Sequence, residues 1–337
     1  MKVLHAPVNI AGQASTIAEA QRTLGIESDV LVFNQNNFNY KCDINLNLNK
    51  KTTIMKIFSI IMNFIKCAIK YDVFHFHFGN SLLPYNIDLP ILKLFRKKII
   101  MHYWGDDVRQ LDIAVNYTHL NMDELKKIYP NAADDKKRKK ISKINKYVNA
   151  SIVGDYYLLP YSPNSIVIKQ AVDLTKIKFV GCRAQNNNTI KIVHAPSNRE
   201  IKGTKYIFPV IQRLRDEGYN IDLILIENKT NEEVLEVCKE ADIIIDQLLL
   251  ESHGVFAIEC MALGKPVLCR IDEKIMKYYP DLPILNTNPD NLYENLKLLI
   301  ENPELRRELG EKGRKYVENV HDSKKIAKQL LELYKSL

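Results

Sequence analysis

The sequence predicts an α/β protein built from two doubly wound, Rossmann-like domains, each with a parallel sheet. Short runs rich in Val, Ile and Phe alternate with longer stretches at helical spacing, which is the pattern of parallel strands covered by helices. The alternation occurs twice along 337 residues, and a polar stretch at 182–189 separates the two series. We therefore predict domains at residues 1–180 and 181–337.

Each predicted strand is a short apolar run of a kind that suits a sheet buried on both faces. The first domain should contain strands at 2–7, 28–33, 72–78, 98–104, 150–154 and 165–170, and the second at 190–197, 222–228, 242–250, 265–271 and 282–286. The Asn-rich segment 34–50 is predicted to be a loop. The amphipathic segment 322–337 is predicted to be a helix, and the sequence leaves open whether it packs on the second domain or back on the first.

The composition is that of a globular protein with a net charge of +8, from 48 basic and 40 acidic residues. This excess suits a phosphate-bearing ligand or an anionic membrane. Nucleic acid is not expected, because zinc-finger spacing, aromatic RNA-binding motifs and basic heptads are missing from the sequence. Six scattered cysteines and the lack of a signal-peptide pattern or a bilayer-length apolar run predict a cytoplasmic protein.

The segment "ESHGVFAIECMALGKPV" carries Glu251 and Glu259, with seven residues between them. It follows a predicted buried strand, and Gly254 stands where the strand must turn into a helix. The backbone N–H groups of Gly254, Val255 and Phe256 would then face the carboxyl edge of the sheet, with the positive end of the helix dipole behind them. Phosphate binds at such a terminus, and carboxylates beside it accept hydrogen bonds from hydroxyls. A diphosphate flanked by hydroxyl-bearing rings is a nucleotide sugar; a plain dipole role for Glu259 stays open.

The two glutamates are followed by a helix of small residues that ends in "GKPV". This arrangement, with Ala262, Gly264, Pro266 and Val267 after the pair, resembles the signature of retaining GT-B glycosyltransferases of family 4. The resemblance implies GT-B architecture, with a cleft between an acceptor domain and a donor domain. It also implies that Glu259 binds the ribose hydroxyls and that Glu251, with the backbone of residues 254–256, holds the donor sugar and phosphate.

A second match to this family is "HAPSNREIKGTKYI", residues 194–207. The resemblance implies that Arg199 and Lys202 clamp the diphosphate, although they stand closer together than the family's pair. Cations at a loop-to-helix boundary suit the neutralisation of a leaving diphosphate. A solvated charged loop is the alternative for both residues.

In the N-terminal half, Gly12 stands where the family has a glycine-rich loop and would let the backbone approach the phosphate. His75 and His77 alternate to one face of a strand, where core histidines are expected. His102, at the end of the strand 98–104, matches the family's histidine near the donor sugar and acceptor. Asp106 and Asp107 follow where relatives often carry an acid.

The expected function is transfer of a sugar, with retention, from a nucleotide sugar to a hydroxyl of a glycan or lipid-linked acceptor. A UDP-sugar is favoured as the donor, although a strand and helix that normally help to contact the base are missing. His102, Glu251 and Lys202 are the expected catalytic residues, and neither a cofactor nor a metal is expected. The alternatives are a GT-B nucleotide-sugar epimerase and a non-catalytic partner subunit of a glycosyltransferase complex.

The segment 50–71 is strongly amphipathic. Its polar residues fall at helical spacing and form one narrow stripe: Lys56, Ser59, Asn63, Lys66 and Lys70. Two interpretations are open. The helix packs against the sheet with only this stripe in water, or part of its apolar surface, with the flanking lysines, contacts an anionic membrane from the inner side.

Overall fold

Two parallel sheets organise the chain, which confirms the predicted fold class. The computed structural model describes residues 1–35, 38–182 and 189–337, so all of the predicted 182–189 linker except its ends lies outside the described residues. The first unit comprises residues 1–110, 133–173 and 322–337, and the second comprises residues 111–132 and 174–321.

The first unit contains a seven-stranded sheet with the order β3-β2-β1-β4-β5-β6-β7, and every pairing in it is parallel. Its strands are β1 (Lys2–Ala6), β2 (Glu27–Val32), β3 (Ile44–Asn45), β4 (Val73–His77), β5 (Lys98–Tyr103), β6 (Ala150–Val153) and β7 (Ile166–Val167). The order reverses at β1 and β4, which places the carboxyl ends of these two strands at a topological switch point, where ligands bind in open α/β sheets.

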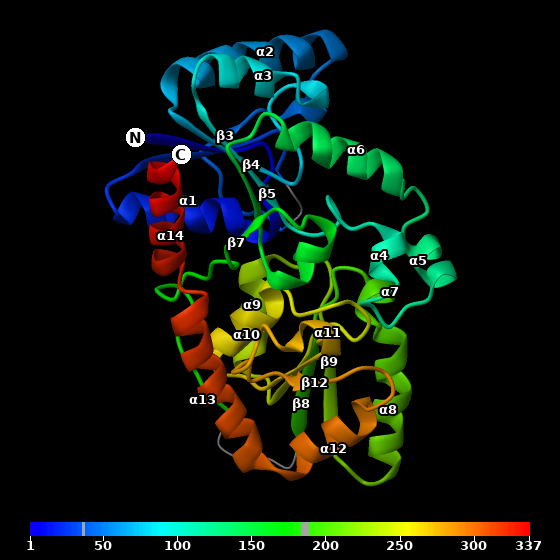
Figure 1. Cartoon of the computed structure of the whole chain (residues 1–337). Helices are drawn as coiled ribbons and strands as arrows, with labels where there is room; N and C mark the ends of the chain where they lie inside the picture. The colour runs from blue at the N-terminus through cyan, green and yellow to red at the C-terminus, as the bar shows by residue number, and fades with distance from the viewer. Residues whose placement is uncertain (36–37, 183–188) are drawn as a thin grey trace. The chain divides into compact units, whose positions relative to one another are not determined.

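Helices cover both faces of this sheet (Figure 1). The helices α2 (Thr53–Lys70), α3 (Asp88–Leu94) and α6 (Asp134–Asn145) lie on one face, while α1 (Gln13–Thr23) and α14 (Ser323–Ser336) lie on the other. Ile326, Leu330 and Tyr334 recur every four residues along α14 and are buried against Ile17 and β-strand residues such as Val3. The C-terminal helix therefore belongs to the core of the first unit.

The second unit contains a five-stranded sheet with the order β12-β11-β10-β8-β9, again parallel throughout. Its strands are β8 (Ile190–His194), β9 (Ile221–Leu225), β10 (Ile243–Ile245), β11 (Val267–Cys269) and β12 (Leu285–Asn286). The helices are α4 (Leu111–Ala114), α5 (Met122–Ile128), α7 (Arg199–Lys202), α8 (Thr204–Asp216), α9 (Asn231–Lys239), α10 (Val255–Leu263), α11 (Glu273–Met276), α12 (Leu292–Glu301) and α13 (Pro303–Val320).

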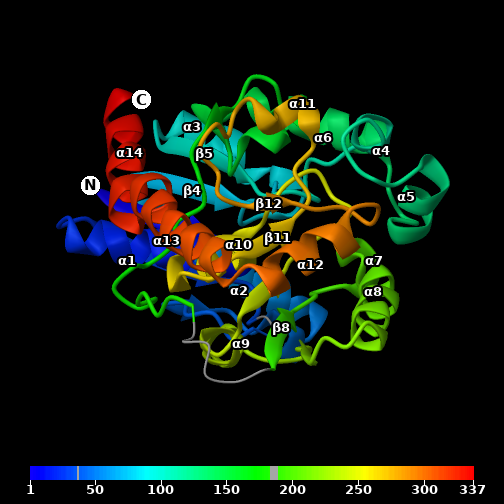
Figure 2. The same cartoon turned by 90° about the horizontal axis from the view of Figure 1, so that it is seen from below.

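The helix α10 is the centre of the second unit, since all of its residues from 257 to 263 are buried. It packs beside α13, as Figure 2 shows. Gly264 ends α10 with φ +83°, and a Cβ atom there would overlap the ring of Phe179. Only glycine satisfies both the backbone conformation and the space, so this motif glycine has a structural reason of its own.

Two sequence predictions need correction at the level of elements. The Asn-rich segment predicted to be a loop contributes β3, a two-residue edge strand paired with Leu31 and Val32. The predicted strand 242–250 is regular only over Ile243–Ile245, because its remaining residues form the loop that leads to α10. Among the described helices, none is both long and apolar enough to cross a membrane.

Candidate functional site

Lys202, the last residue of α7, forms an ion pair with Asp246, which follows β10 directly. The Lys202 Nζ lies 2.5 Å from Asp246 Oδ1, and the two side chains are 13% and 1% exposed. The thiol of Cys269 lies 3.8 Å from the other carboxylate oxygen. A buried carboxylate needs such a partner, so Lys202 is held in place by Asp246, a residue that the sequence analysis missed. An acid immediately after the apolar run of β10 was the available signal.

Arg199 begins α7 and pairs with Glu227, which lies in the loop after β9. The Arg199 Nε donates to Glu227 Oε1 at 2.8 Å, and the second guanidinium nitrogen bonds the other oxygen. Asn198 caps the helix by accepting from the backbone N–H groups of Glu200 and Ile201. Arg199 is 53% exposed, so its pair is a solvent-facing one in contrast to that of Lys202.

Glu251 lies in the loop between β10 and α10 and is 1% exposed. Gly254 is the N-cap residue of α10, and a Cβ atom added to it would meet no other atom within 4 Å. Since no side chain among the described residues caps this helix, the first backbone N–H groups, at Gly254, Val255 and Phe256, offer their hydrogens outward. This geometry matches the predicted anion-binding terminus.

Glu259 lies in the second turn of α10 and is 9% exposed. Asn231, the first residue of α9, donates to Glu259 Oε2 at 3.0 Å. Burial raises the pKa of Glu259 from 4.5 to about 7, and the hydrogen bond from Asn231 partly opposes that rise. The carboxyl thus has one fixed donor and is poised between its protonated and ionised forms near neutral pH. Asn231 is a second residue that the sequence analysis did not identify.

The carboxyl ends of β8, β9 and β10 bring these predicted residues to one edge of the second sheet. The ion pair between Lys202 and Asp246 links the segments after β8 and β10. A Cβ atom on Gly203 would lie 3.1 Å from Leu248, so α7 contacts the loop that continues to Glu251. The segments that carry the predicted donor residues are therefore linked at this edge, and the bonds of Arg199 to Glu227 and of Glu259 to Asn231 connect them to the segments after β9.

In the first unit, Gly12 connects the short 3₁₀ turn Ile10–Gly12, which follows β1, to α1. It is left-handed, with φ +69°, and a Cβ atom there would lie 2.8 Å from the ring of Tyr40. Both the conformation and the contact require glycine. The predicted position of Gly12 after the first strand is correct, and its structural role alone is sufficient to explain the residue type.

His102 lies in β5, one residue before its end, and is fully buried. Trp104 stacks on it, with ring centroids 3.8 Å apart. Asp107 accepts from the backbone N–H of Trp104 at 3.1 Å and of Gly105 at 2.8 Å, and burial raises its pKa to about 6. Asp106 is half exposed and pairs with Arg109. Of the two acids, Asp107 shapes the turn and Asp106 faces solvent.

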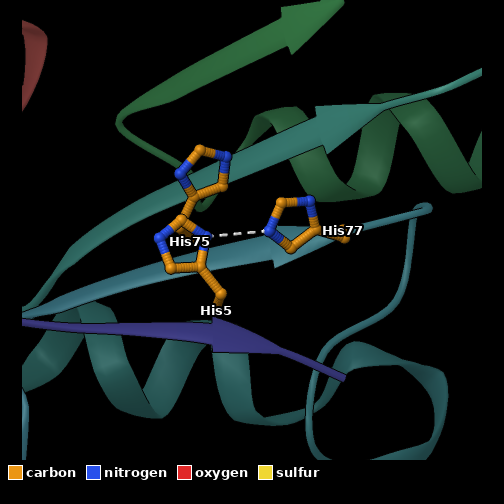
Figure 3. A group of neighbouring side chains, drawn as sticks. All are labelled: His5, His75 and His77. Atoms are coloured by element: carbon orange, nitrogen blue, oxygen red, sulfur yellow. Dashed lines mark hydrogen bonds between the residues drawn. The ribbon is translucent and has the colours of Figure 1, made fainter. Parts of the chain in front are cut away.

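Four buried histidines cluster beside this strand end: His5 on β1, His75 and His77 on β4, and His102 on β5. Figure 3 shows the first three, with the bond of 3.0 Å between His5 Nδ1 and His77 Nε2. These three offer nitrogens that lie within 4.8 Å of one another. Burial lowers the pKa of His5 to about 4 and lowers that of the other three well below the usual value. All four are therefore neutral imidazoles at pH 7.

The face that α2 turns outward is apolar, which contradicts the interpretation in which only the polar stripe is in water. Phe64 and Cys67 are buried, whereas the stripe residues Lys56, Ser59 and Asn63 are only partly exposed. We define the α2–α3 surface as the exposed apolar residues Ile54, Met55, Ile57, Phe58, Ile61, Met62, Ile65 and Ile69 of α2 with Ile91, Leu94 and Phe95 of α3 and its end. Both helices cover the same face of the first sheet (Figure 1).

Comparison with known proteins concerns first the second unit. Residues 195–316 match the family described as glycosyl transferases group 1. A stretch of 96 residues is 31% identical to "Uncharacterized glycosyltransferase MJ1178" of Methanocaldococcus jannaschii. This match spans 27% of the chain and 27% of that relative.

The fold as a whole is similar to solved structures over nearly the full chain. Anabaena Alr3699/HepE in complex with UDP-glucose has a TM-score of 0.67 at 12% identity and covers 100% of both chains. Sucrose-phosphate synthase from Thermosynechococcus elongatus has a TM-score of 0.66 at 15% identity and covers 99% of this chain and 98% of its own. At these identities the likeness shows the fold. The family match is confined to residues 195–316, within the second unit.

Proposed function

We propose that the protein transfers a sugar from a nucleotide sugar, preferably a UDP-sugar, to a hydroxyl of a glycan or lipid-linked acceptor, with retention at the anomeric carbon. The observation that carries the proposal is the buried carboxyl of Glu259 beside the uncapped start of α10, within the residues that match the glycosyl transferases group 1 family. An anion site next to a hydroxyl acceptor suits a nucleotide diphosphate. The similar fold of HepE was solved in complex with UDP-glucose, which supports the choice of uridine.

In this proposal each of the predicted residues of the second unit binds a different part of the donor. The backbone N–H groups of residues 254–256 bind a phosphate, Glu259 accepts hydrogen bonds from the ribose hydroxyls, and Glu251 accepts from the donor sugar. Lys202 neutralises charge that develops on the departing diphosphate. In the first unit, Gly12 lets the backbone approach a phosphate, and His102 contacts the sugar.

The reaction is proposed to need neither a metal nor a cofactor, since fixed cations stabilise the leaving group. Asp246 holds Lys202 at the edge of the sheet. The ammonium of Lys202 would therefore contact both this carboxylate and a bound diphosphate. Arg199 shares its guanidinium with Glu227 in the same way. No protein nucleophile is assigned, because the leaving phosphate takes the proton of the acceptor. Activity that survives EDTA would agree with this mechanism, and full loss that manganese restores would contradict it.

The deciding experiment is a panel of UDP-, GDP- and ADP-sugars, each incubated with and without glycan and lipid-linked acceptors. Transfer with retained anomeric configuration, lost in Glu259→Ala, supports the proposal. Epimerised donor in the absence of acceptor would instead establish the epimerase alternative. Donor binding without turnover on every acceptor would favour the non-catalytic partner subunit.

We also propose that the α2–α3 surface rests on an anionic bilayer, at the inner face of the cytoplasmic membrane. The exposed fractions of Ile54, Phe58 and Ile69 are 81%, 66% and 79%, which is unusual for large apolar side chains on one helix. No acidic residue occurs between Lys50 and Tyr71, and Lys66, Lys93 and Arg96 are exposed around the apolar residues. An apolar face bordered by cations is complementary to anionic lipid headgroups and would bring the enzyme to a lipid-linked acceptor.

Flotation with anionic and neutral vesicles tests this surface. The protein should float with anionic vesicles at low salt, and Phe58→Ser should weaken that binding. Phe208→Ser is the matched control, because Phe208 is a half-exposed phenylalanine of the second unit. A concentration-dependent dimer that Phe58→Ser dissociates, without flotation of the wild type, would identify a second copy of the chain as the partner and contradict the membrane proposal.

A further inference from the structure

The four buried histidines of the first unit belong to a longer hydrogen-bonded chain that starts at Trp104. The indole Nε1–H of Trp104 donates to His77 Nδ1 at 3.1 Å. His77 Nε2 lies 3.0 Å from His5 Nδ1, and His5 Nε2 lies 3.0 Å from Gln21 Oε1. The strand residues are thus joined to the helix α1 through an amide.

From Gln21 the chain returns to the sheet through the C-terminal helix. The Nε2 of Gln21 donates to the hydroxyl of Tyr334 at 3.2 Å. That hydroxyl lies 2.5 Å from His75 Nδ1, and His75 Nε2 lies 3.1 Å from His102 Nδ1. Seven side chains are therefore linked by six hydrogen bonds, from Trp104 to the histidine on which Trp104 stacks.

The first half of the chain has one allowed direction, because an indole nitrogen only donates. A neutral imidazole has one donor and one acceptor nitrogen. Since His77 Nδ1 accepts from Trp104, His77 Nε2–H must donate to His5 Nδ1. His5 Nε2–H must then donate to Gln21, which fixes the amide oxygen toward His5 and the amide nitrogen toward Tyr334.

The second half follows from the orientation of this amide. The phenol of Tyr334 accepts from Gln21, so its own hydrogen is directed to the remaining neighbour, His75 Nδ1. His75 Nε2–H then donates to His102 Nδ1, and the proton of His102 is left on Nε2. Each step requires a neutral ring, and the complete burial of all four histidines supplies that condition.

The hydrogen-bonded chain ends at His102 Nε2, an atom that finds no partner among the described residues. The ring of His102 is fully buried. An unsatisfied buried donor is costly, and its place at the end of a strand in the predicted site points to an oxygen of a ligand as the missing acceptor.

We propose that this one-way chain fixes His102 as the neutral Nε2–H tautomer, so that it can only donate a hydrogen bond to a ligand bound at this strand end. Tyr334 is then a positioning residue, which acts from the last helix through His75. The tautomer itself follows from the contacts, whereas the nucleotide sugar as that ligand rests on the proposed function. His102 in this state is a donor and has no free lone pair with which to act as a base.

Nuclear magnetic resonance of protein labelled with ¹⁵N at its histidine rings tests the chain directly. Long-range proton–nitrogen correlations should show four neutral rings, with the His102 proton on Nε2. Tyr334→Phe removes the link to His75 and should let the His102 proton distribute between both nitrogens. Tyr71→Phe is the matched control, since this buried tyrosine of the same unit bonds Asp29 outside the chain. Its spectrum should retain the wild-type tautomer.

Gln21→Leu interrupts the hydrogen-bonded chain at a different link and should likewise let the His102 proton distribute between both nitrogens. It replaces Tyr334→Phe as the test if that variant fails to fold. A proton on His102 Nδ1 in the wild type, or an unchanged tautomer in a folded Tyr334→Phe or Gln21→Leu protein, would overturn the proposal. Stoichiometric zinc in the purified protein would do the same, since a metal on His5, His75 and His77 would replace the bonds of the first half.

The kinetic test separates positioning from stability. Tyr334→Phe should lower kcat about tenfold, with the donor KM unchanged and with a urea midpoint near that of Tyr71→Phe. A wild-type kcat in a variant whose tautomer has changed would refute the role of His102 as a required donor. If no transferase activity exists at all, the proposed function fails, while the resonance experiment still decides the tautomer.

Discussion

The two units differ in how they satisfy the polar side chains on and after the central strands of their sheets. In the second unit, Lys202 and Asp246 form an ion pair that joins the segments after β8 and β10, and Arg270 pairs with Asp272 within the segment after β11. In the first unit, Lys169 and Asp155 also form a buried ion pair in the segments after β7 and β6. The central strands β1, β4 and β5, however, carry neutral imidazoles such as His75 and His102, joined in a directed chain. Both units are parallel sheets, so the fold does not impose either solution.

The difference shows which features each kind of site depends on. An ion pair needs two side chains of opposite charge, and its partners attract each other over several ångströms. A directed hydrogen-bond chain needs every member in its place, because one reversed ring breaks the direction for all that follow. The stability of the second unit is therefore expected to change less with pH than the stability of the first.

Acidification should produce the largest effect, and it should fall on the first unit. The four histidines stay neutral in the fold because burial lowers their pKa values, whereas in the unfolded chain they take up protons below about pH 6.5. Stability is thus full above that pH and is lost as pH falls toward the folded values, near 4 for His5. Asp88 and Asp107, whose pKa values burial raises, act in the opposite direction. The net loss between pH 7.5 and 5 should be on the order of 5 kcal/mol.

Trp104, the single tryptophan, reports this unit by fluorescence during urea unfolding. In the second unit, His194, with a pKa lowered to about 4, and Glu259, with a pKa raised to about 7, contribute with opposite signs. Hydrogen exchange should therefore show a smaller loss of protection there. An equal loss in both units would remove the contrast between them.

Lys202→Met should have the next largest effect, this time in the second unit. It leaves the carboxylate of Asp246, 1% exposed, without its cation, which costs about 3–5 kcal/mol of unfolding free energy. The double variant Lys202→Met/Asp246→Asn removes both charges and should recover most of that loss. Urea unfolding followed by circular dichroism measures both. Equal stability of the single variant and the wild type would show that the pair is not structural.

Glu259→Gln should weaken UDP-glucose binding roughly 10- to 100-fold, because the ribose hydroxyls lose a charged acceptor worth about 1–3 kcal/mol. Ribose hydroxyls favour the ionised carboxylate, so wild-type affinity should rise with pH through about 7, the raised pKa of Glu259, and then level off. Calorimetry in buffers of different ionisation enthalpy should detect proton release on binding below that pH. The glutamine variant should bind with the same affinity at pH 6 and pH 8. A pH-dependent affinity that persists in this variant would assign the titration to another group.

Arg199→Ala should have the smallest effect on stability, since its pair with Glu227 is largely solvent-exposed. The melting temperature is expected to stay at that of the wild type. A loss of turnover without a change in melting temperature would assign Arg199 to the diphosphate, and a clear drop in melting temperature would show that the pair with Glu227 is structural.

The comparison also explains how far the site was predictable. The motif around Glu251 and Glu259 is local, because a strand, a glycine and a helix in succession define where the backbone N–H groups point. Asp246 and Asn231 escaped notice because their roles depend on residues 44 and 28 positions away in the sequence. The outward apolar face of α2 was also undecided, since a helical stripe shows which residues share a face and leaves open whether that face meets the core or water.

The sequence by itself determined the two parallel sheets, the βα order of the strands and the local turns that present Lys202, Gly254 and His102, because the periodicity and turn chemistry behind them act over a few residues. Only the tertiary structure decided that the C-terminal helix joins the first unit and inserts Tyr334 between Gln21 and His75. That contact joins positions 259 residues apart in the sequence, and hydrogen bonds between such distant residues leave no periodic trace. The direction of the histidine chain is therefore a property of the folded protein.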